Sequence, residues 1–276
     1  MIRVTTLIDN EPGDGLHSEW GLSFLVEAYG QRFIFDTGAS GKTVDNAKKL
    51  GVDLKNIDGI FLSHGHVDHT GGLLDLLAAT STVNIYAQTG IWQKRYSSGG
   101  KRDPDENIGM PGSVQALEQK GACFHVSEAS FFLGSNVYTT GVIPYRSEFE
   151  KPNATLLVQQ GQDRVIDPFN DELALVIHSK PGLIIVVGCA HRGLINTIKQ
   201  AQAISGVGHV YAVIGGSHLH DATPEIIEKT ITELNRIGVQ KLSLCHCTGA
   251  AALEMVNHSF KGECIFNHSG ASIRLM

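Results

Sequence analysis

Short apolar runs, rich in β-branched and aromatic residues, recur along the whole chain and alternate with glycine and polar residues. Runs of this length and composition are typical of strands that are buried in a sheet. Strands are therefore predicted at residues 2–8, 22–29, 32–38, 59–64, 83–88, 123–126, 136–141, 154–160, 173–179, 183–189, 210–216, 241–246 and 264–270.

Helical patterns fall between these strands, at about residues 42–50, 71–79, 113–120, 193–204, 223–237 and 250–257. The clearest lies at 223–237, where Thr223 can cap the helix and Pro224 suits the first helical position. The apolar residues of that segment recur on one helical face: Ile226, Ile227, Ile231, Leu234 and Ile237. Strands interleaved with helices predict α/β layers around one core.

Residues 93–113 differ from the rest of the chain, because they are polar, rich in glycine, serine and charge, and without periodicity. A long loop is predicted there. Loops of this length inside compact domains often cover a functional site, so the segment is either a lid or a surface loop without a role. Because no repeat or linker interrupts the pattern, residues 1–276 are interpreted as a single domain.

The composition narrows the class of protein. Hydrophobic residues make up 42% and charged residues 18%, which is too apolar for a disordered chain. A net charge of -6 argues against a nucleic-acid partner, which would require a basic surface. The N-terminus lacks the basic and apolar regions of a signal peptide, and no apolar stretch reaches the roughly 18 residues that span a membrane. A cytoplasmic protein without a membrane partner is therefore expected.

The cysteine count agrees with that compartment. The chain has an odd number of cysteines without the spacing of a small disulfide framework, which fits a reducing environment. They are Cys123, Cys189, Cys245, Cys247 and Cys264.

The stretch FLSHGHVDHTGGL concentrates metal-binding side chains directly after an apolar run: His64, His66, Asp68 and His69. His64 and His66 are two residues apart, so in an extended segment they project to the same side. Four such ligands suit two adjacent metal ions better than one tetrahedral ion, which could rarely use them all. Imidazole and carboxylate ligands suit zinc, and also iron or manganese. The alternative is a loop of surface histidines that bind no metal.

Further ligands are expected at the ends of other strands, because a site at the edge of a sheet collects residues from strand tips. Three apolar runs end abruptly in glycine or cysteine and then histidine. The candidates at these ends are Cys189 and His191; His218 and His220; and Cys245, His246 and Cys247. Together with the end at His64, they predict a converging site. The remaining histidines are interpreted as ordinary surface or core residues.

The stretch around His64 resembles the His-x-His-x-Asp-His signature of the metallo-β-lactamase superfamily, and the run FIFDTG resembles an earlier motif of that superfamily. The resemblance implies a four-layer αβ/βα sandwich with a dinuclear metal site at one edge of the sheets. It also implies that His64 and His66 bind the first metal and that Asp68 and His69 bind the second. Asp36 would not bind metal but would orient the ligand loop.

The chain departs from the superfamily pattern at two places. It has FNDELALVI where many members carry a Gly-His-Thr-Pro-Gly-like motif, and a later strand ends in Gly188-Cys189 instead of Gly-Asp. The usual third histidine and bridging aspartate are thus both missing. His191 is the expected replacement on the first metal. Cys189 either replaces the bridging carboxylate as a thiolate or is a small buried residue.

Other positions complete the expected site. His246 matches the last histidine ligand of the superfamily, on the second metal. His218 is either a metal ligand or substrate-facing residue, or it orients another ligand. Asp171 or Glu172 is a candidate carboxylate near the site.

The runs VVGCAHRG, AVIGGSHLH and HCTG narrow the resemblance to one branch. That branch includes archaeal dihydropterin ribofuranosyl-aminobenzene phosphate synthase and bacterial metal-dependent hydrolases. The segments VTTLIDN and LHSEWGLSFLVE also resemble it, so the likeness covers nearly the whole chain.

A metal-dependent hydrolase is the leading hypothesis, with two ions, expected to be zinc, activating a water against an ester, lactone or phosphoester bond. Asp68 would orient that water and carry a proton to the leaving group. The small-molecule substrate would favour an anionic group, because the helix after His191 should aim free N–H groups at the site. The cations of the 93–113 segment either add charge over the site or are simply solvated: Lys94, Arg95, Lys101 and Arg102.

Two alternatives remain open. The first is a synthase that condenses a pterin with a phosphoribosyl compound, which needs a larger pocket with basic residues. The second is a redox protein that holds metal without hydrolysis. Superfamily members with redox irons tend to have a glutamate at the position of His66, so that residue counts against the second alternative.

Overall fold

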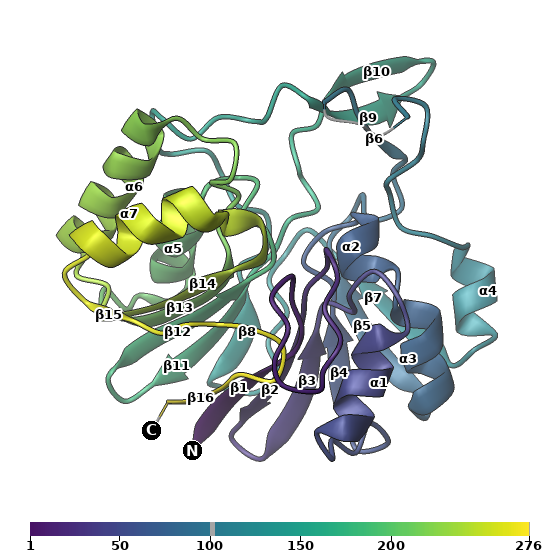
Figure 1. The fold of residues 1–276 in the computed structure, drawn as a ribbon. Coiled ribbons are helices and arrows are strands. Elements are labelled where there is room, and N and C mark those ends of the chain that lie inside the picture. Colours follow the sequence, from purple (N-terminus) through teal and green to yellow (C-terminus); the bar gives the residue numbers. More distant parts are fainter. Residues whose placement is uncertain (100–102, 276) are drawn as a thin grey trace.

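The computed structural model describes residues 1–99 and 103–275 (Figure 1). Its largest sheet has the strand order β16-β1-β2-β3-β4-β5-β7. These strands are β1 (Ile2–Ile8), β2 (Ser23–Ala28), β3 (Gln31–Phe35), β4 (Gly59–Phe61), β5 (Val83–Ala87), β7 (Ala122–Val126) and β16 (Ser272–Leu275). Strands β3, β4, β5 and β7 are parallel, whereas β16, β1, β2 and β3 pair antiparallel.

A second sheet has the order β15-β14-β13-β12-β11-β8. Its strands are β8 (Val137–Thr139), β11 (Leu175–Ser179), β12 (Gly182–Val187), β13 (Val210–Gly216), β14 (Lys241–Cys245) and β15 (Glu263–Cys264). Because β12, β13 and β14 are parallel, their carboxyl ends lie at one edge of this sheet. A third, small sheet consists of β6 (Arg95–Ser97), β9 (Leu156–Gln160) and β10 (Asp163–Ile166).

Helices cover the outer faces of the two large sheets (Figure 1). Along the first sheet lie α1 (Lys42–Lys49), α2 (Val67–Thr70), α3 (Leu73–Ala79) and α4 (Val114–Glu118). The second sheet is covered by α5 (Leu194–Ser205), α6 (Pro224–Ile237) and α7 (Ala250–Ser259), and a 3-10 turn, His246–Thr248, follows β14.

Strand β12 shows how the layers form. Its side chains alternate between two apolar clusters: Ile184 and Val186 pack between the two sheets, whereas Ile185 and Val187 pack under the helices. This alternation is the two-residue period of a strand, and a continuous apolar run is typical of a parallel strand buried on both faces. A third cluster lies between the first sheet and its helices. The four-layer αβ/βα sandwich predicted from the resemblance is confirmed.

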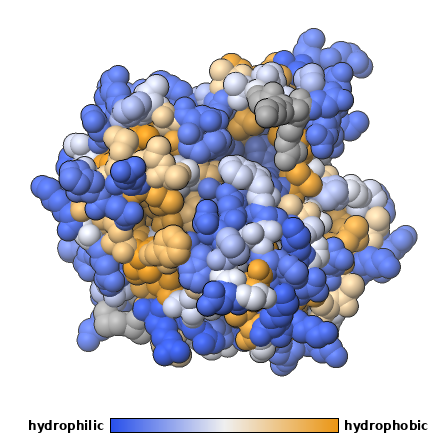
Figure 2. All heavy atoms as spheres, in the orientation of Figure 1, coloured by the Kyte–Doolittle hydropathy of each residue, from blue (hydrophilic) through white to orange (hydrophobic). Residues whose placement is uncertain are grey.

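The cluster between the sheets draws side chains from both halves of the chain, including Phe33 and Phe61 from the first half and Leu175 from the second. This shared core supports the interpretation of residues 1–276 as one domain, which stays a prediction. Polar and charged residues cover much of the face drawn in Figure 2, and hydrophobic residues gather mainly around α7. Among the described residues, the structure has no helix with the length and apolar character of a membrane span.

Some elements differ from the sequence predictions. Strand β10 was not predicted, because all four of its residues are exposed and it therefore lacks an alternating buried face. Of the strand predicted at 264–270, only residue 264 lies in an observed strand, β15. The chain then forms β16, which pairs with β1. Within the segment predicted as a loop, β6 forms because it pairs with the distant β9, a contact that local sequence cannot reveal.

Candidate metal centre

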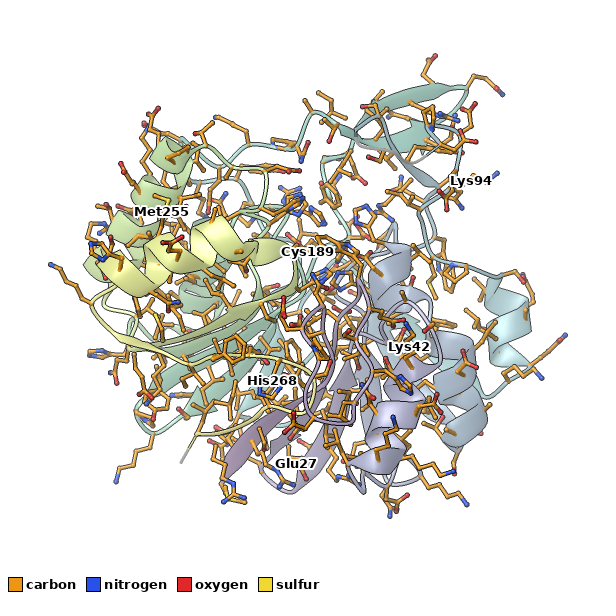
Figure 3. All side chains as sticks on the ribbon, viewed as in Figure 1. Glu27, Lys42, Lys94, Cys189, Met255 and His268 are labelled. Atoms are coloured by element: carbon orange, nitrogen blue, oxygen red, sulfur yellow. The ribbon has the colours of Figure 1, made fainter. Side chains whose placement is uncertain are left out.

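The predicted ligands lie at one edge of the two large sheets, between the two halves of the molecule. Figure 3 labels Cys189 at that junction. The loop after β4 brings in His64, and the chain after β12 brings in Cys189 and His191. His246 begins the turn after β14. The convergence of strand tips that was predicted from the sequence is therefore present.

Three imidazoles form the first ligand group. Nε2 of His64 lies 3.1 Å from Nδ1 of His66 and 3.2 Å from Nε2 of His191. Nitrogen atoms bound to one tetrahedral zinc ion at about 2.0–2.1 Å lie roughly 3.3 Å apart, so these distances fit a single ion. All three rings are buried, and Phe169 stacks on the ring of His191 with the centroids 3.9 Å apart.

The second ligand group combines a carboxylate with two imidazoles. Oδ2 of Asp68 lies 3.4 Å from Nε2 of His246 and 3.8 Å from Nε2 of His69. Asp68 also lines a pocket beside this group. This donor set suits a second divalent ion.

Cys189 lies between the two groups. Its Sγ is 3.1 Å from Nε2 of His69. The sulfur also lies within 4.8 Å of the ligand atoms of His64 and His191, and within 4.8 Å of those of His69 and His246. This is the position expected of a bridging ligand. Burial raises the pKa of the Cys189 thiol, so a bound ion would have to displace its proton.

A hydrogen-bond chain from Asp36 orients two of the imidazoles. Nδ1–H of His69 donates to Oδ2 of Asp36 at 2.7 Å. Oγ of Ser63 donates to the same carboxylate oxygen at 2.7 Å and lies 2.9 Å from Nδ1 of His64. Each ring thus uses Nδ1 for support and turns Nε2 toward the site, as is common for histidines that bind metal. Gly188 permits this packing, because a Cβ there would collide with the side chain of Ser63.

His246 has a support of its own. Its Nδ1–H donates to Oδ1 of Asn10 at 3.0 Å, and the amide group of Asn10 donates to the carbonyl of His246 at 3.2 Å. Asn10 follows the first strand and was missed at the sequence level. The argument from strand ends could have found it, because Asn10 is the second residue after an apolar run.

The electrostatics suit neutral ligands at the first group and a cation at the second. Burial holds the pKa values of His64 and His191 well below the ordinary value and lowers that of His66 to about 3, so these rings are neutral, as metal ligands must be. Against the effect of burial, Asp36 and Asp68 raise the pKa of His69 to about 9. The field that stabilises a proton on His69 would equally stabilise a metal ion.

Asp171 and Glu172, the candidate carboxylates, do not join either ligand group. Oδ2 of Asp171 accepts a hydrogen bond from the backbone of Gly65 at 2.8 Å. Glu172 accepts the backbone N–H groups of His191 and Arg192 at 2.6 and 2.7 Å. Both carboxylates therefore hold the backbone of the ligand-bearing loops in place.

The interpretation of Arg95 as a solvated residue was wrong, because it is buried and pairs with Asp167 at 2.7 Å and Asp171 at 2.5 Å. Its charge reaches the first ligand group, where burial and Arg95 together lower the pKa of His66. Two carboxylates from the segment before β11 draw the guanidinium inward. Lys94 is exposed and points away from the site (Figure 3). Lys101 and Arg102 lie outside the described residues.

The helix after His191 does not present all of its first amides to a substrate. Glu150 accepts hydrogen bonds from the backbone N–H groups of Ile195 and Asn196, at 2.8 and 2.9 Å. The carboxylate of Glu150 therefore occupies the position that was predicted for an anionic substrate group. Sequence reasoning missed this contact, because the two segments are 45 residues apart.

The pocket beside the ligand groups has a volume of about 1080 Å³. Ser97, Gly99 and Ile108 of the 93–113 segment form part of its wall, and Trp20 lies at its edge with its ring 5.1 Å from that of His246. The segment thus borders the site; whether it moves as a lid stays a prediction. The backbone of this segment also contacts the ligand loop, because Val67 N–H donates to the carbonyl of Ile108.

His218 also faces this pocket. Its ring centroid lies 4.2 Å from that of His191, and its backbone N–H donates to Sγ of Cys247 at 3.3 Å. The ring is therefore beside the first ligand group without belonging to it. Trp20 was not assigned a role from the sequence, whereas Cys247 was a candidate at the end of its strand.

Comparisons with known proteins agree with this fold. Residues 21–99 match the family model described as the metallo-beta-lactamase superfamily. A protein of Methanocaldococcus jannaschii, named 7,8-dihydropterin-6-methyl-4-(beta-D-ribofuranosyl)-aminobenzene-5'-phosphate synthase, is 33% identical over 99% of this chain and 96% of its own length. The crystal structure of Tm1679, described as a metal-dependent hydrolase of the beta-lactamase superfamily, is 29% identical, with a TM-score of 0.86 over 100% of this chain and 99% of that one. Zn(2+)-bound PqqB from Methylobacterium extorquens shares the fold at 12% identity, with a TM-score of 0.61 over 99% of this chain and 100% of its own.

Proposed function

Because the chain belongs to the metallo-beta-lactamase superfamily, we propose that it is a metal-dependent hydrolase with a dinuclear centre. The observation that carries this proposal is the pair of ligand groups that meet at Cys189. We propose two zinc ions, with manganese or iron as alternatives, because imidazole, carboxylate and thiolate ligands suit zinc. The first ion would be held by His64, His66 and His191.

The second ion would be held by Asp68, His69 and His246, with the Cys189 thiolate shared by both. A pair of bound metal ions supplies Lewis acidity, which lowers the pKa of a water molecule and polarises the bond that the water attacks. Asp68 would orient that water, because the residue lies beside His246 and also lines the pocket. Against the effect of burial, His69 and His246 hold the pKa of Asp68 well below its usual range, so the residue is a carboxylate that can accept a hydrogen bond from the water.

The bond attacked would be an ester, lactone or phosphoester of a small molecule in the pocket. Phe149, Leu219 and Ile226 line the pocket on the side of α5 and α6, which favours a substrate with an apolar part. A phosphorylated substrate has less support than the sequence suggested. Glu150 occupies two amides of α5, and Lys151 is the single lysine or arginine among the described residues that line the pocket.

A synthase activity is the second candidate. It is favoured by the 33% identity to the Methanocaldococcus jannaschii synthase and by a pocket large enough for two small substrates. The scarcity of basic residues in the wall counts against it, because phosphoribosyl groups are usually bound by cationic side chains.

The first test is the identity and stoichiometry of bound metal, measured by plasma mass spectrometry on untagged protein. We expect about two zinc ions per chain, and loss of the ions held by these two groups in a His64→Ala, His69→Ala double variant, because each ligand group then lacks one histidine. A His209→Ala, His258→Ala variant is the matched control, since both residues are exposed.

A count near two zinc or manganese ions per chain would justify an activity screen. The screen would compare the hydrolysis of esters, lactones and phosphodiesters with the synthase reaction. Two irons would instead favour the redox alternative. The dinuclear centre would be contradicted if protein prepared without chelators contained no metal above background, even after attempted reloading.

A further inference from the structure

Cys189, His218 and Cys247 form a third group of ligand atoms, and only Cys189 belongs to the proposed dinuclear centre. The two sulfur atoms and the imidazole nitrogen all lie within 4.8 Å of one another. Both cysteines are buried, and neither forms a disulfide. Each of the three residues follows a different strand: β12, β13 or β14. All three line the pocket.

The approach of the two thiols requires a special backbone arrangement. Strand β13 lies between β12 and β14, so equivalent positions on the outer two are roughly 10 Å apart. The thiols meet because β13 ends in a glycine. A Cβ at Gly216 would lie 2.6 Å from Sγ of Cys247 and 3.4 Å from Cα of Cys189. Glycine thus leaves the space in which Cys247 reaches across and donates to the carbonyl of Cys189 at 3.7 Å.

His218 reaches the same place at a conformational cost. Its φ of +48° is in the left-handed region, which is strained for a residue with a side chain and recurs at functional sites. In this conformation its backbone N–H donates to Sγ of Cys247 at 3.3 Å. Nδ1 of His218 is buried and has no hydrogen-bond partner among the described residues. A buried nitrogen of this kind requires an explanation, and a bound ion is one.

Packing alone does not explain these features. A buried cysteine that serves only as a small apolar residue needs neither a second thiol beside it nor an imidazole nitrogen directed at the pair. Two thiolates and one imidazole are instead the donor set of a zinc site that keeps its fourth position open. Here the open position would face the pocket, where a water or a substrate group could fill it.

We propose that Cys189, His218 and Cys247 form a third ion position, beside the dinuclear centre, that takes a single soft divalent ion such as zinc or cadmium. This position does not require an occupied dinuclear centre. Because the Cys189 thiolate serves both, an ion at the third position draws that sulfur away from the bridge. Excess soft metal should therefore weaken binding at the dinuclear centre.

Cadmium alone is the probe, because its bonds to sulfur give a charge-transfer absorbance in the ultraviolet and its NMR shift reports the number of sulfur ligands. The background is the His64→Ala, His69→Ala variant, in which each group of the dinuclear centre lacks a histidine while the third group is intact. We expect one cadmium ion with two thiolates. Adding Cys247→Ser should reduce the absorbance by about half and lower affinity, because one of two soft ligands is lost.

Cys245→Ser is the matched control, since Cys245 is a buried thiol at the end of the same strand but outside the group. It should leave the cadmium signal unchanged. If the double histidine variant does not fold, Cys247→Ser is tested in the otherwise unaltered chain. The signal of a cadmium ion bound by two thiolates should then disappear, whereas the signal of one thiolate, from Cys189, should remain.

Three results would overturn the third position. These are a folded double histidine variant without cadmium–thiolate absorbance, a signal that Cys247→Ser leaves unaltered, and a Cys189–Cys247 disulfide in freshly purified protein. Failure of the dinuclear centre is recognised separately, because metal counting on the unaltered chain would then find the ion of the third position alone.

Discussion

At the scale of single residues, the carboxylate of Asp36 has the most connections to the candidate centre. It accepts hydrogen bonds from His69, from the hydroxyl of Ser63 at 2.7 Å and from the backbone N–H of Ser63 at 2.7 Å. Its own φ of +59° lies in the left-handed region, where a residue other than glycine is strained. The surrounding hydrogen bonds keep this conformation, and the conformation brings the carboxylate to the ligand loop.

We predict that Asp36→Asn lowers the affinity for the second metal ion by about 10- to 100-fold, because an amide –NH₂ cannot accept the Nδ1–H of His69. Titration with a metal buffer measures this change. Asp45→Asn, at an exposed position on α1, is the control and should leave the affinity unaltered. Unaltered affinity in Asp36→Asn, in a folded variant, would show that Asp36 does not orient His69.

The candidate ligands that the sequence indicated most directly lie close together along the chain. His64, His66, Asp68 and His69 fall within six positions, so their spacing alone indicated a shared site. Their supports could not be predicted in this way. Asn10 meets His246 across 236 residues, and such a contact depends on the whole strand order. The role of Cys189 as a bridge remains a prediction that its position supports.

At the scale of elements, Glu150 joins the segment before β9 to the first turn of α5. Its carboxylate accepts the N–H groups of Ile195 and Asn196, and Lys199 and Glu233 of α5 and α6 also influence its charge. Burial nevertheless dominates and raises the pKa of Glu150 to about 7 from an ordinary value of 4.5.

This shift predicts a pH dependence of stability. Since the folded state binds the proton of Glu150 more tightly than the unfolded state, the free energy of unfolding falls as pH rises from about 4.5 to about 7. The contribution is on the order of 3 kcal/mol and levels off above pH 7. Glu150→Gln cannot titrate, so denaturant unfolding across this pH range should show a smaller decline. Glu148→Gln, at an exposed position nearby, should decline like the unaltered chain; equal slopes in all three would contradict the prediction.

Helices and strands were predicted where a buried face gives the apolar residues a regular spacing, and were missed where no such face exists. Helix α6 was expected at 223–237 and occupies Pro224–Ile237, with Ile227, Ile231 and Leu234 buried. Strands β6 and β10 have few apolar contacts of their own and depend on pairing with β9. Their existence is a property of the tertiary structure, so local sequence could not indicate it.

At the scale of the whole molecule, the layers followed from the alternation of strands and helices, and the superfamily resemblance supplied their order. The candidate centre joins the two sheets. The loop after β4 in the first sheet supplies four candidate ligands, and the ends of β12 and β14 in the second supply three more: Cys189, His191 and His246. An ion bound there would link the two halves of the chain.

Removal of metal should therefore lower the stability of the whole fold. An ion that binds only the folded state stabilises it by about 2.7 kcal/mol when its concentration is 100 times its Kd. In chains of about this size, each kcal/mol shifts the melting temperature by roughly 2–4 °C. We expect chelation to lower the melting temperature of reloaded protein by about 5–11 °C, measured by circular dichroism. The His64→Ala, His69→Ala variant should respond much less to the chelator. If protein with demonstrated metal melts at the same temperature after chelation, the ions do not hold the two sheets together.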